Sequence, residues 1–174
     1  MRPPPGITTP EQLGDGLARL VWENFGDALS YVRALYDASR GEDGDEAPEM
    51  VAEELLILLL WAHTRACQQA FSGRSDPELL KATLDAMHRA VFEDLEAHGT
   101  PREQLPLIEQ RISARYSEYY QAADGGVGTV GEVAARWVGG TSRANPRLSA
   151  LLTETAVAAA GPLRDFLDDI VLAG

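Results

Sequence analysis

Two ionisable side chains one helical turn apart form the first group of residues that could do chemistry. Asp94 and His98 are four positions apart, so both lie on one face of a helical segment. A tight turn near residue 74 would bring this end beside the start of the preceding helix, where Glu53 lies. Carboxylates and an imidazole together suit a metal ion or acid–base work, which makes Glu53, Asp94 and His98 a candidate metal site. Alternatively, His98 caps its helix and pairs with Asp94, and because such pairs are commonly structural we expect neither a cofactor nor a stoichiometric metal.

The second candidate is a ligand pocket around His63, which lies on an apolar face of the most hydrophobic segment. Cys67 follows one turn later on that face and is interpreted as a small buried hydrophobic residue. A buried imidazole requires a hydrogen-bond partner, and Tyr116 or Tyr119 from a later helix could supply it. His63 is then either a core histidine with satisfied hydrogen bonds, or a polar point that orients a ligand in a pocket with Cys67, Tyr116 and Tyr119.

Motifs with more specific chemistry are missing from the sequence. It contains no His-Glu-x-x-His and no Glu-x-x-His, which disfavours zinc-protease and di-iron sites. It has no Gly-x-Ser-x-Gly elbow, and its Gly-rich stretch after Asp124 lacks the Lys-Ser or Lys-Thr of a phosphate loop. The pair Asp85 and His88 fits solvent-facing positions better than a metal site. These observations favour a protein without enzymatic activity.

The elements that position these residues are predicted to be helices throughout. Capping residues followed by proline mark most helix starts, and a glycine follows most ends. No segment shows the alternation expected of a strand. The predicted helices cover residues 10–40, 48–72, 77–98, 101–124, 130–138 and 146–172.

Short connections between these helices predict an all-α fold, a single-domain, up-down antiparallel bundle in which helices two, three and four are neighbours. A short fifth helix and a C-terminal helix packed across the core complete it. Residues 1–9 are expected to be a flexible segment and residues 125–147 a Gly-rich connector, whose Trp137 belongs either to a lid or to a plug on the core. Glycines in the first helix and Gly161-Pro162 in the last predict a kink or break in each.

The charge of the chain restricts its partners and its location. A net charge of −12 argues against nucleic acid and anionic membranes. Seven acids and no base lie between Glu42 and Glu54, which suits a basic protein partner, although acids at a helix N-terminus need no partner. The apolar run 55–62 is too short to span a bilayer. The start Met1–Pro5 has no secretory signal, so we expect a cytoplasmic location, and the composition favours a GC-rich bacterial source.

A hydrophobic strip on the helix face opposite His63 is a candidate interface. It contains Leu58 and Trp61 and is bracketed by opposite charges one turn away on each side. If the other helices pack on the His63 face, the strip is bare and resembles the core of a homodimer interface. If the C-terminal helix covers the strip, Trp61 belongs to the core instead.

One stretch resembles part of a known family. Asp76-Pro77-Glu78-Leu79-Leu80 through His98-Gly99 is similar to part of the ligand-binding domain of TetR-type regulators, over about two dozen residues. Those proteins begin with a basic helix-turn-helix, which residues 1–45 do not offer, so membership is not inferred. Three functions therefore stay open. The first is a non-enzymatic protein that acts through protein contacts, the second a binder of an apolar small molecule, and the third a metal-dependent enzyme.

Overall fold

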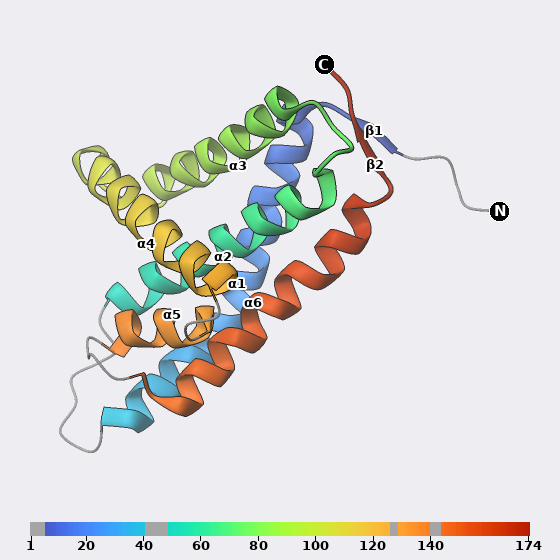
Figure 1. Cartoon of the computed structure of the whole chain (residues 1–174). Coiled ribbons are helices and arrows are strands. Elements are labelled where there is room, and N and C mark those ends of the chain that lie inside the picture. Colours follow the sequence, from blue (N-terminus) through green and yellow to red (C-terminus); the bar gives the residue numbers. More distant parts are fainter. Residues whose placement is uncertain (1–5, 41–48, 126–128, 140–143) are drawn as a thin grey trace.

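Six α-helices pack against each other in the computed structural model, which describes residues 6–40, 49–125, 129–139 and 144–174 (Figure 1). This arrangement confirms the predicted all-α helical bundle. Each helix matches a predicted segment, and the largest differences are a later start of the fourth and an earlier end of the sixth. The helices are α1 (Pro10–Arg40), α2 (Glu49–Phe71), α3 (Pro77–Ala97), α4 (Leu105–Gly125), α5 (Val130–Gly139) and α6 (Pro146–Leu167), with a short 3₁₀ helix, Arg102–Gln104, before α4.

Side-chain caps explain where several helices begin. In α1 the Thr9 hydroxyl accepts a hydrogen bond from the Gln12 backbone N–H, and the Gln12 side chain accepts one from the Thr9 N–H. Thr129 and Glu132 form the same reciprocal pair at α5. The Asn145 side chain accepts hydrogen bonds from two backbone N–H groups at the start of α6. These caps satisfy N–H groups that have no partner inside the helix, so the starts could be read from the sequence.

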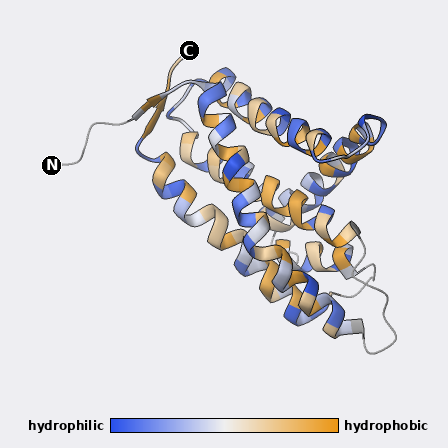
Figure 2. Cartoon of the chain, turned by 180° about the vertical axis from the view of Figure 1, so that it is seen from behind, coloured by the Kyte–Doolittle hydropathy of each residue, from blue (hydrophilic) through white to orange (hydrophobic). Residues whose placement is uncertain are grey.

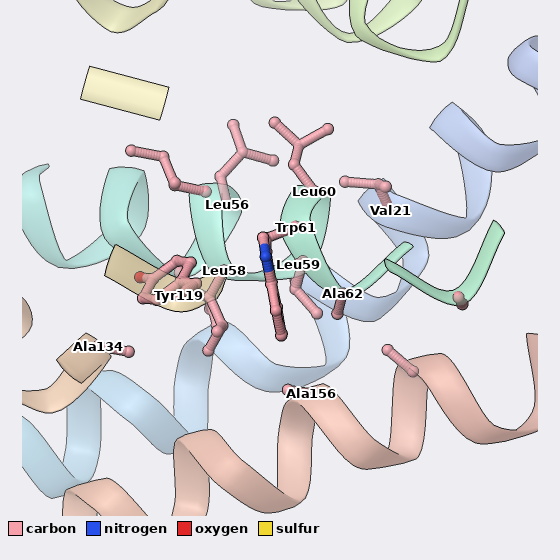
Figure 3. Close-up of a cluster of buried hydrophobic side chains, with 14 of the residues drawn as sticks. Val21, Leu56, Leu58, Leu59, Leu60, Trp61, Ala62, Tyr119, Ala134 and Ala156 are labelled. Atoms are coloured by element: carbon pink, nitrogen blue, oxygen red, sulfur yellow. The ribbon is translucent and has the colours of Figure 1, made fainter. Parts of the chain in front are cut away.

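Helix α2 lies at the centre of the fold and contacts all five other helices (Figures 1 and 3). Every side chain from Glu54 to Thr64 is buried. Full burial of a leucine or isoleucine side chain contributes roughly 1.5–3 kcal/mol, so this run is a major source of hydrophobic stabilisation. Helix α2 therefore has neighbours within the chain on both of its faces.

Helix α3 packs chiefly against α1, while α6 packs chiefly against α2. Helices two, three and four were expected to be neighbours, and α2 does contact both α3 and α4, but α3 and α4 diverge from their short connection (Figure 1). Gly14 explains the close crossing of α1 and α3. A Cβ atom at position 14 would lie 2.5 Å from the Ala86 Cβ and 2.9 Å from the Met87 backbone nitrogen.

Helix α1 is continuous despite its three glycines, and α6 continues through Pro162. Of the predicted kink or break, a break is therefore not found in either helix. Glycine lowers helix propensity by about 1 kcal/mol relative to alanine, a cost that the packing of α1 against α3, α2 and α6 outweighs.

Two short strands join segments from opposite ends of the sequence. Strand β1 (Gly6–Thr8) pairs in parallel with β2 (Ile170–Leu172), and β2 is hydrophobic throughout (Figure 2). The Arg74 guanidinium, which follows α2, donates hydrogen bonds to the backbone carbonyls of Asp168 and Ile170, at 2.9 and 3.3 Å. We call this pair of strands with Arg74 the terminal clasp.

The terminal clasp corrects two sequence-based expectations. Residues 6–8 belong to a strand rather than to a flexible segment, whereas residues 1–5 lie outside the described residues. The last helix ends at Leu167 instead of continuing to residue 172. Strands of three residues are too short to show alternation, and their pairing depends on a partner almost the whole chain away.

Candidate ligand site between α1, α2 and α6

A cavity of ≈ 510 Å³ opens between α1, α2 and α6. Its walls are mostly apolar, with Leu20 on α1 and with Leu163 and Phe166 on α6, and only Asn24 and His63 among its lining side chains are polar. Small-molecule sites commonly have this volume and this combination of apolar walls with few polar groups. We call it the α1–α2–α6 cavity.

Helical spacing brings these lining residues together. Leu20 and Asn24 are one turn apart on α1, and Ala159 and Leu163 are one turn apart on α6, so each pair lies on one face of its helix. His63 comes from the buried middle of α2. Phe166 stays 56% exposed at the rim, although an apolar side chain gains from burial. A ligand in the cavity would cover part of this ring.

The hydrogen bonds of His63 fix which of its ring nitrogens carries the proton. Its Nδ1 lies 2.8 Å from the Leu59 backbone oxygen, which can only accept, so Nδ1 is the protonated nitrogen. Its Nε2 therefore accepts, and the Asn24 side-chain amide donates to it at 3.4 Å. Burial lowers the pKa of His63, against the opposing effect of the bond to Leu59. The imidazole is accordingly neutral at pH 7.

Asn24 uses its amide N–H groups inside the protein. Its Nδ2 donates to the Leu20 backbone oxygen at 2.9 Å as well as to His63. Because the Leu20 oxygen can only accept, the amide nitrogen must face it, and the Oδ1 oxygen is directed elsewhere. Within the described residues no hydrogen bond to this Oδ1 is found. Asn24 Oδ1 is thus the acceptor of this polar pair that has no hydrogen bond within the described residues.

The backbone oxygen of Ala158 is a second acceptor at the same cavity, because Pro162 cannot donate to it. In an α-helix the carbonyl of residue 158 accepts from the N–H of residue 162, but proline has no N–H. Both Ala158 and Pro162 line the cavity. The Ala158 backbone oxygen therefore lacks its helical hydrogen-bond partner at this wall.

The structure brings only one of the four predicted pocket residues to this cavity. Cys67 is fully buried, and burial raises the pKa of its thiol to about 12, as fits a small hydrophobic residue. Tyr119 packs against Trp61 with ring centroids 5.6 Å apart. The partner of His63 is Asn24, which the sequence analysis did not identify. Its signal was a polar residue in register with the apolar positions Leu13, Leu17 and Leu20 of α1.

Tyr116 belongs to a separate polar chain between α2, α3 and α4. The His88 Nδ1 lies 2.8 Å from the Leu84 backbone oxygen, so its Nε2 accepts a hydrogen bond from the Tyr116 hydroxyl at 2.8 Å. The Thr64 hydroxyl lies 3.4 Å from the same Tyr116 oxygen. His88 is thus a partly buried link between helices and does not occupy the solvent-facing position expected from the sequence.

The predicted metal cluster is not assembled. Glu53 forms an ion pair with Arg111, while the Asp94 carboxylate accepts a hydrogen bond from Trp22 Nε1 at 2.8 Å. His98 is exposed, and its Nδ1 lies 2.7 Å from the Asp94 backbone oxygen, which matches the helix-capping alternative. The part of the chain that the structure describes contains no group of three His, Cys, Asp or Glu residues placed to hold a metal ion.

The hydrophobic strip opposite His63 is covered within the chain. Leu58 is fully buried and Trp61 is 6% exposed. Trp61 extends from α2 toward Tyr119 and Tyr120 of α4 and toward α6 near Ala156 (Figure 3). The strip therefore has no exposed surface that a second copy could contact. The C-terminal helix helps to cover it, as the second alternative proposed.

The last two acids of the run from Glu42 to Glu54 form ion pairs within the chain. Residues 41–48 lie outside the described residues, and Glu53 contacts Arg111. Glu54 is 1% exposed and forms a bidentate pair with Arg115, with nitrogen–oxygen distances of 2.7–3.1 Å. The Trp137 ring covers the Arg115 guanidinium, whose Cζ lies 3.2 Å from the ring centroid. Trp137, which is 37% exposed, thus packs over a buried charge of the core.

Comparisons of the chain with protein families, with curated proteins and with solved structures give no match. The similarity of residues 76–99 to TetR-type regulators therefore stays a partial one. Among the described helices none has the length and apolar character needed to cross a membrane.

Proposed function

We propose that the protein binds an apolar small molecule in the α1–α2–α6 cavity. The observation that carries this proposal is the hydrogen-bonded pair of half-buried Asn24 and buried His63 in an otherwise apolar wall. A polar atom that a ligand shields from water costs affinity unless its hydrogen bond is made, and one acceptor of this pair, Asn24 Oδ1, has no partner within the described residues. Asn24, which is held in place by His63, replaces the predicted tyrosines as the residue that orients the ligand.

Action through protein contacts is the less supported alternative. The strip with Leu58 and Trp61, which motivated a homodimer, is buried inside one chain. The acids Glu53 and Glu54 already have arginine partners, which weakens the argument for a basic protein partner. A metal-dependent enzyme has less support still, because Glu53, Asp94 and His98 each contact different groups.

Binding of an uncharged fluorescent probe tests the proposal. N-phenyl-1-naphthylamine should bind wild type with one saturable site and increased emission. Ala158→Trp places bulk at the cavity wall and should abolish this binding. Ala150→Trp is the matched control, because Ala150 is an exposed position of α6 that does not line the cavity, and it should bind like wild type. Equal binding by both variants, or none by folded wild type, would contradict the proposal.

A further inference from the structure

The hydrogen-bonding atoms of the α1–α2–α6 cavity restrict the chemistry of its ligand. The His63 Nδ1 donates to the Leu59 oxygen and its Nε2 accepts from Asn24, so the imidazole has no free hydrogen-bonding atom for a ligand. Asn24 donates to Leu20 and to His63, which leaves its Oδ1. The atom that the pair can present to a ligand is therefore an acceptor.

The backbone adds an atom of the same kind. The Ala158 carbonyl oxygen has no N–H partner at position 162, because that residue is proline. Ala158, Pro162 and Asn24 all line the cavity. Two residues from different helices that line the same mostly apolar space thus each have an acceptor without a protein donor, and a bound molecule satisfies these acceptors only by donating hydrogen bonds.

Charged ligands have no counter-ion in this cavity. None of its lining side chains is a lysine, arginine, aspartate or glutamate. A carboxylate would lose its hydration without gaining a donor, and an ammonium group would be desolvated without an anion. An uncharged hydroxyl group avoids both penalties and still donates a hydrogen bond.

We propose that the ligand of the α1–α2–α6 cavity is an apolar alcohol, and that the site discriminates against carboxylic acids of the same chain length. This inference rests on the proposed function. Asn24 and the Ala158 carbonyl select the hydroxyl group by accepting from it, while the apolar walls, with Leu20, Leu163 and Phe166, hold the hydrocarbon chain.

Competition by a matched set of ligands tests this selectivity. 1-Octanol, methyl octyl ether and octanoate have similar chains, and they should be titrated at pH 8 against bound N-phenyl-1-naphthylamine. Octanol should displace the probe at a concentration several-fold to about tenfold below that of the ether, which lacks a donor. Octanoate should be weaker than octanol by about a hundredfold or more.

The outcomes separate the two levels of the proposal. If the probe does not bind wild type, the proposed function fails. If the probe binds but octanoate competes as well as octanol, or the ether equals octanol, the cavity binds ligands and the alcohol inference is overturned.

Two variants assign the selectivity to the acceptors. Pro162→Ala restores an N–H that can satisfy the Ala158 oxygen, and it favours the helix, so the variant should fold. Asn24→Leu removes the side-chain acceptor. In either variant the octanol-to-ether ratio should fall by about two- to tenfold, while binding of the ether itself is kept. A ratio equal to wild type in both variants overturns the inference.

Discussion

Buried histidines are the residues whose chemistry depends most on the surrounding fold. His63 and His88 each use Nδ1 to donate to the carbonyl four residues earlier, and each accepts through Nε2 from a neighbouring helix. Burial is the largest effect on the pKa of both and lowers it. Both imidazoles therefore stabilise the fold in their neutral form.

Acidification should destabilise the protein through these two histidines. In the unfolded chain they bind protons as pH falls through about 6.5, whereas the folded chain keeps them neutral to lower pH. The unfolded state then binds more protons, so the free energy of unfolding is highest above pH 6.5 and falls below it. The slope is up to about 1.4 kcal/mol per pH unit for each histidine.

Urea unfolding between pH 8 and pH 5 measures this slope. His63→Gln and His88→Gln should each show a smaller loss of stability on acidification than wild type. A free energy of unfolding that is unchanged down to pH 5 would contradict the neutral assignment of both imidazoles.

Substitution of His63 separates lost hydrogen bonding from buried charge. His63→Leu should fold and lose only about 1 kcal/mol, because it leaves the Asn24 amide without one acceptor. His63→Asp should lose about 3–5 kcal/mol, because its carboxylate would be buried without a cation. Thermal melts followed by circular dichroism distinguish them, and an Asp variant as stable as wild type would require an exposed position 63.

At the scale of elements, two glycines each allow a close approach between helices. Gly14 lets α1 contact the α3 backbone at Met87, and Gly131 brings α5 against α6 at Ser149 and Thr153. The sequence shows these residues only as weak points of a helix. Their role follows from the facing helix, which the sequence does not identify.

Alanine at Gly14 and at Gly16 should have effects of opposite sign. Gly14→Ala places a methyl group against Ala86 and the Met87 backbone, and overpacking of this kind costs about 1–3 kcal/mol. Gly16 has open space around it, so Gly16→Ala should raise the free energy of unfolding by up to about 1 kcal/mol. Urea denaturation checks both values, and stabilisation by Gly14→Ala would argue against the close crossing of α1 and α3.

The ion pair between α2 and α4 should depend on both partners. Glu54→Leu alone leaves the buried Arg115 guanidinium unpaired and should cost about 3–5 kcal/mol. Glu54→Leu with Arg115→Met removes both charges and should recover most of that loss. A double-mutant cycle by chemical denaturation measures the coupling energy. Additive effects would show that the two groups do not interact.

How much of this arrangement was predictable differs between elements. The helix limits follow from local signals such as the capping pair Thr9 and Gln12, so they were found to within a few residues. The packing of α3 against α1 was not found, because the sequence shows only that a short loop makes α3 and α4 neighbours along the chain, and not which helix faces α3 most closely. His63 was recognised as a polar residue on an apolar face, whereas Asn24 gains its meaning only when α1 lies against α2.

For the whole molecule, a single chain buries its own hydrophobic surface around α2. Trp61 is the clearest test, because the sequence placed it either at a homodimer interface or in the core. The structure surrounds it by α2, α4 and α6 (Figure 3).

Trp61→Glu should therefore unfold the chain and not merely separate two copies. A carboxylate at this position would be buried without a cation, at a cost of about 3–5 kcal/mol, and the contacts with Tyr119 and Tyr120 would be lost. Circular dichroism and sedimentation velocity, measured together, check this. A wild-type dimer converted to a folded monomer would instead place Trp61 at an interface.

The terminal clasp also bears on the order of events during folding. Its strands come from nearly opposite ends of the sequence, so their pairing closes a loop of almost the whole chain. Such closure carries a large entropic cost until intervening helices have brought the ends near each other. The bundle must then form first and the clasp last. For the same reason the amide proton of Ala173, bonded to the Thr8 oxygen, should exchange with deuterium long before those in the middle of α2.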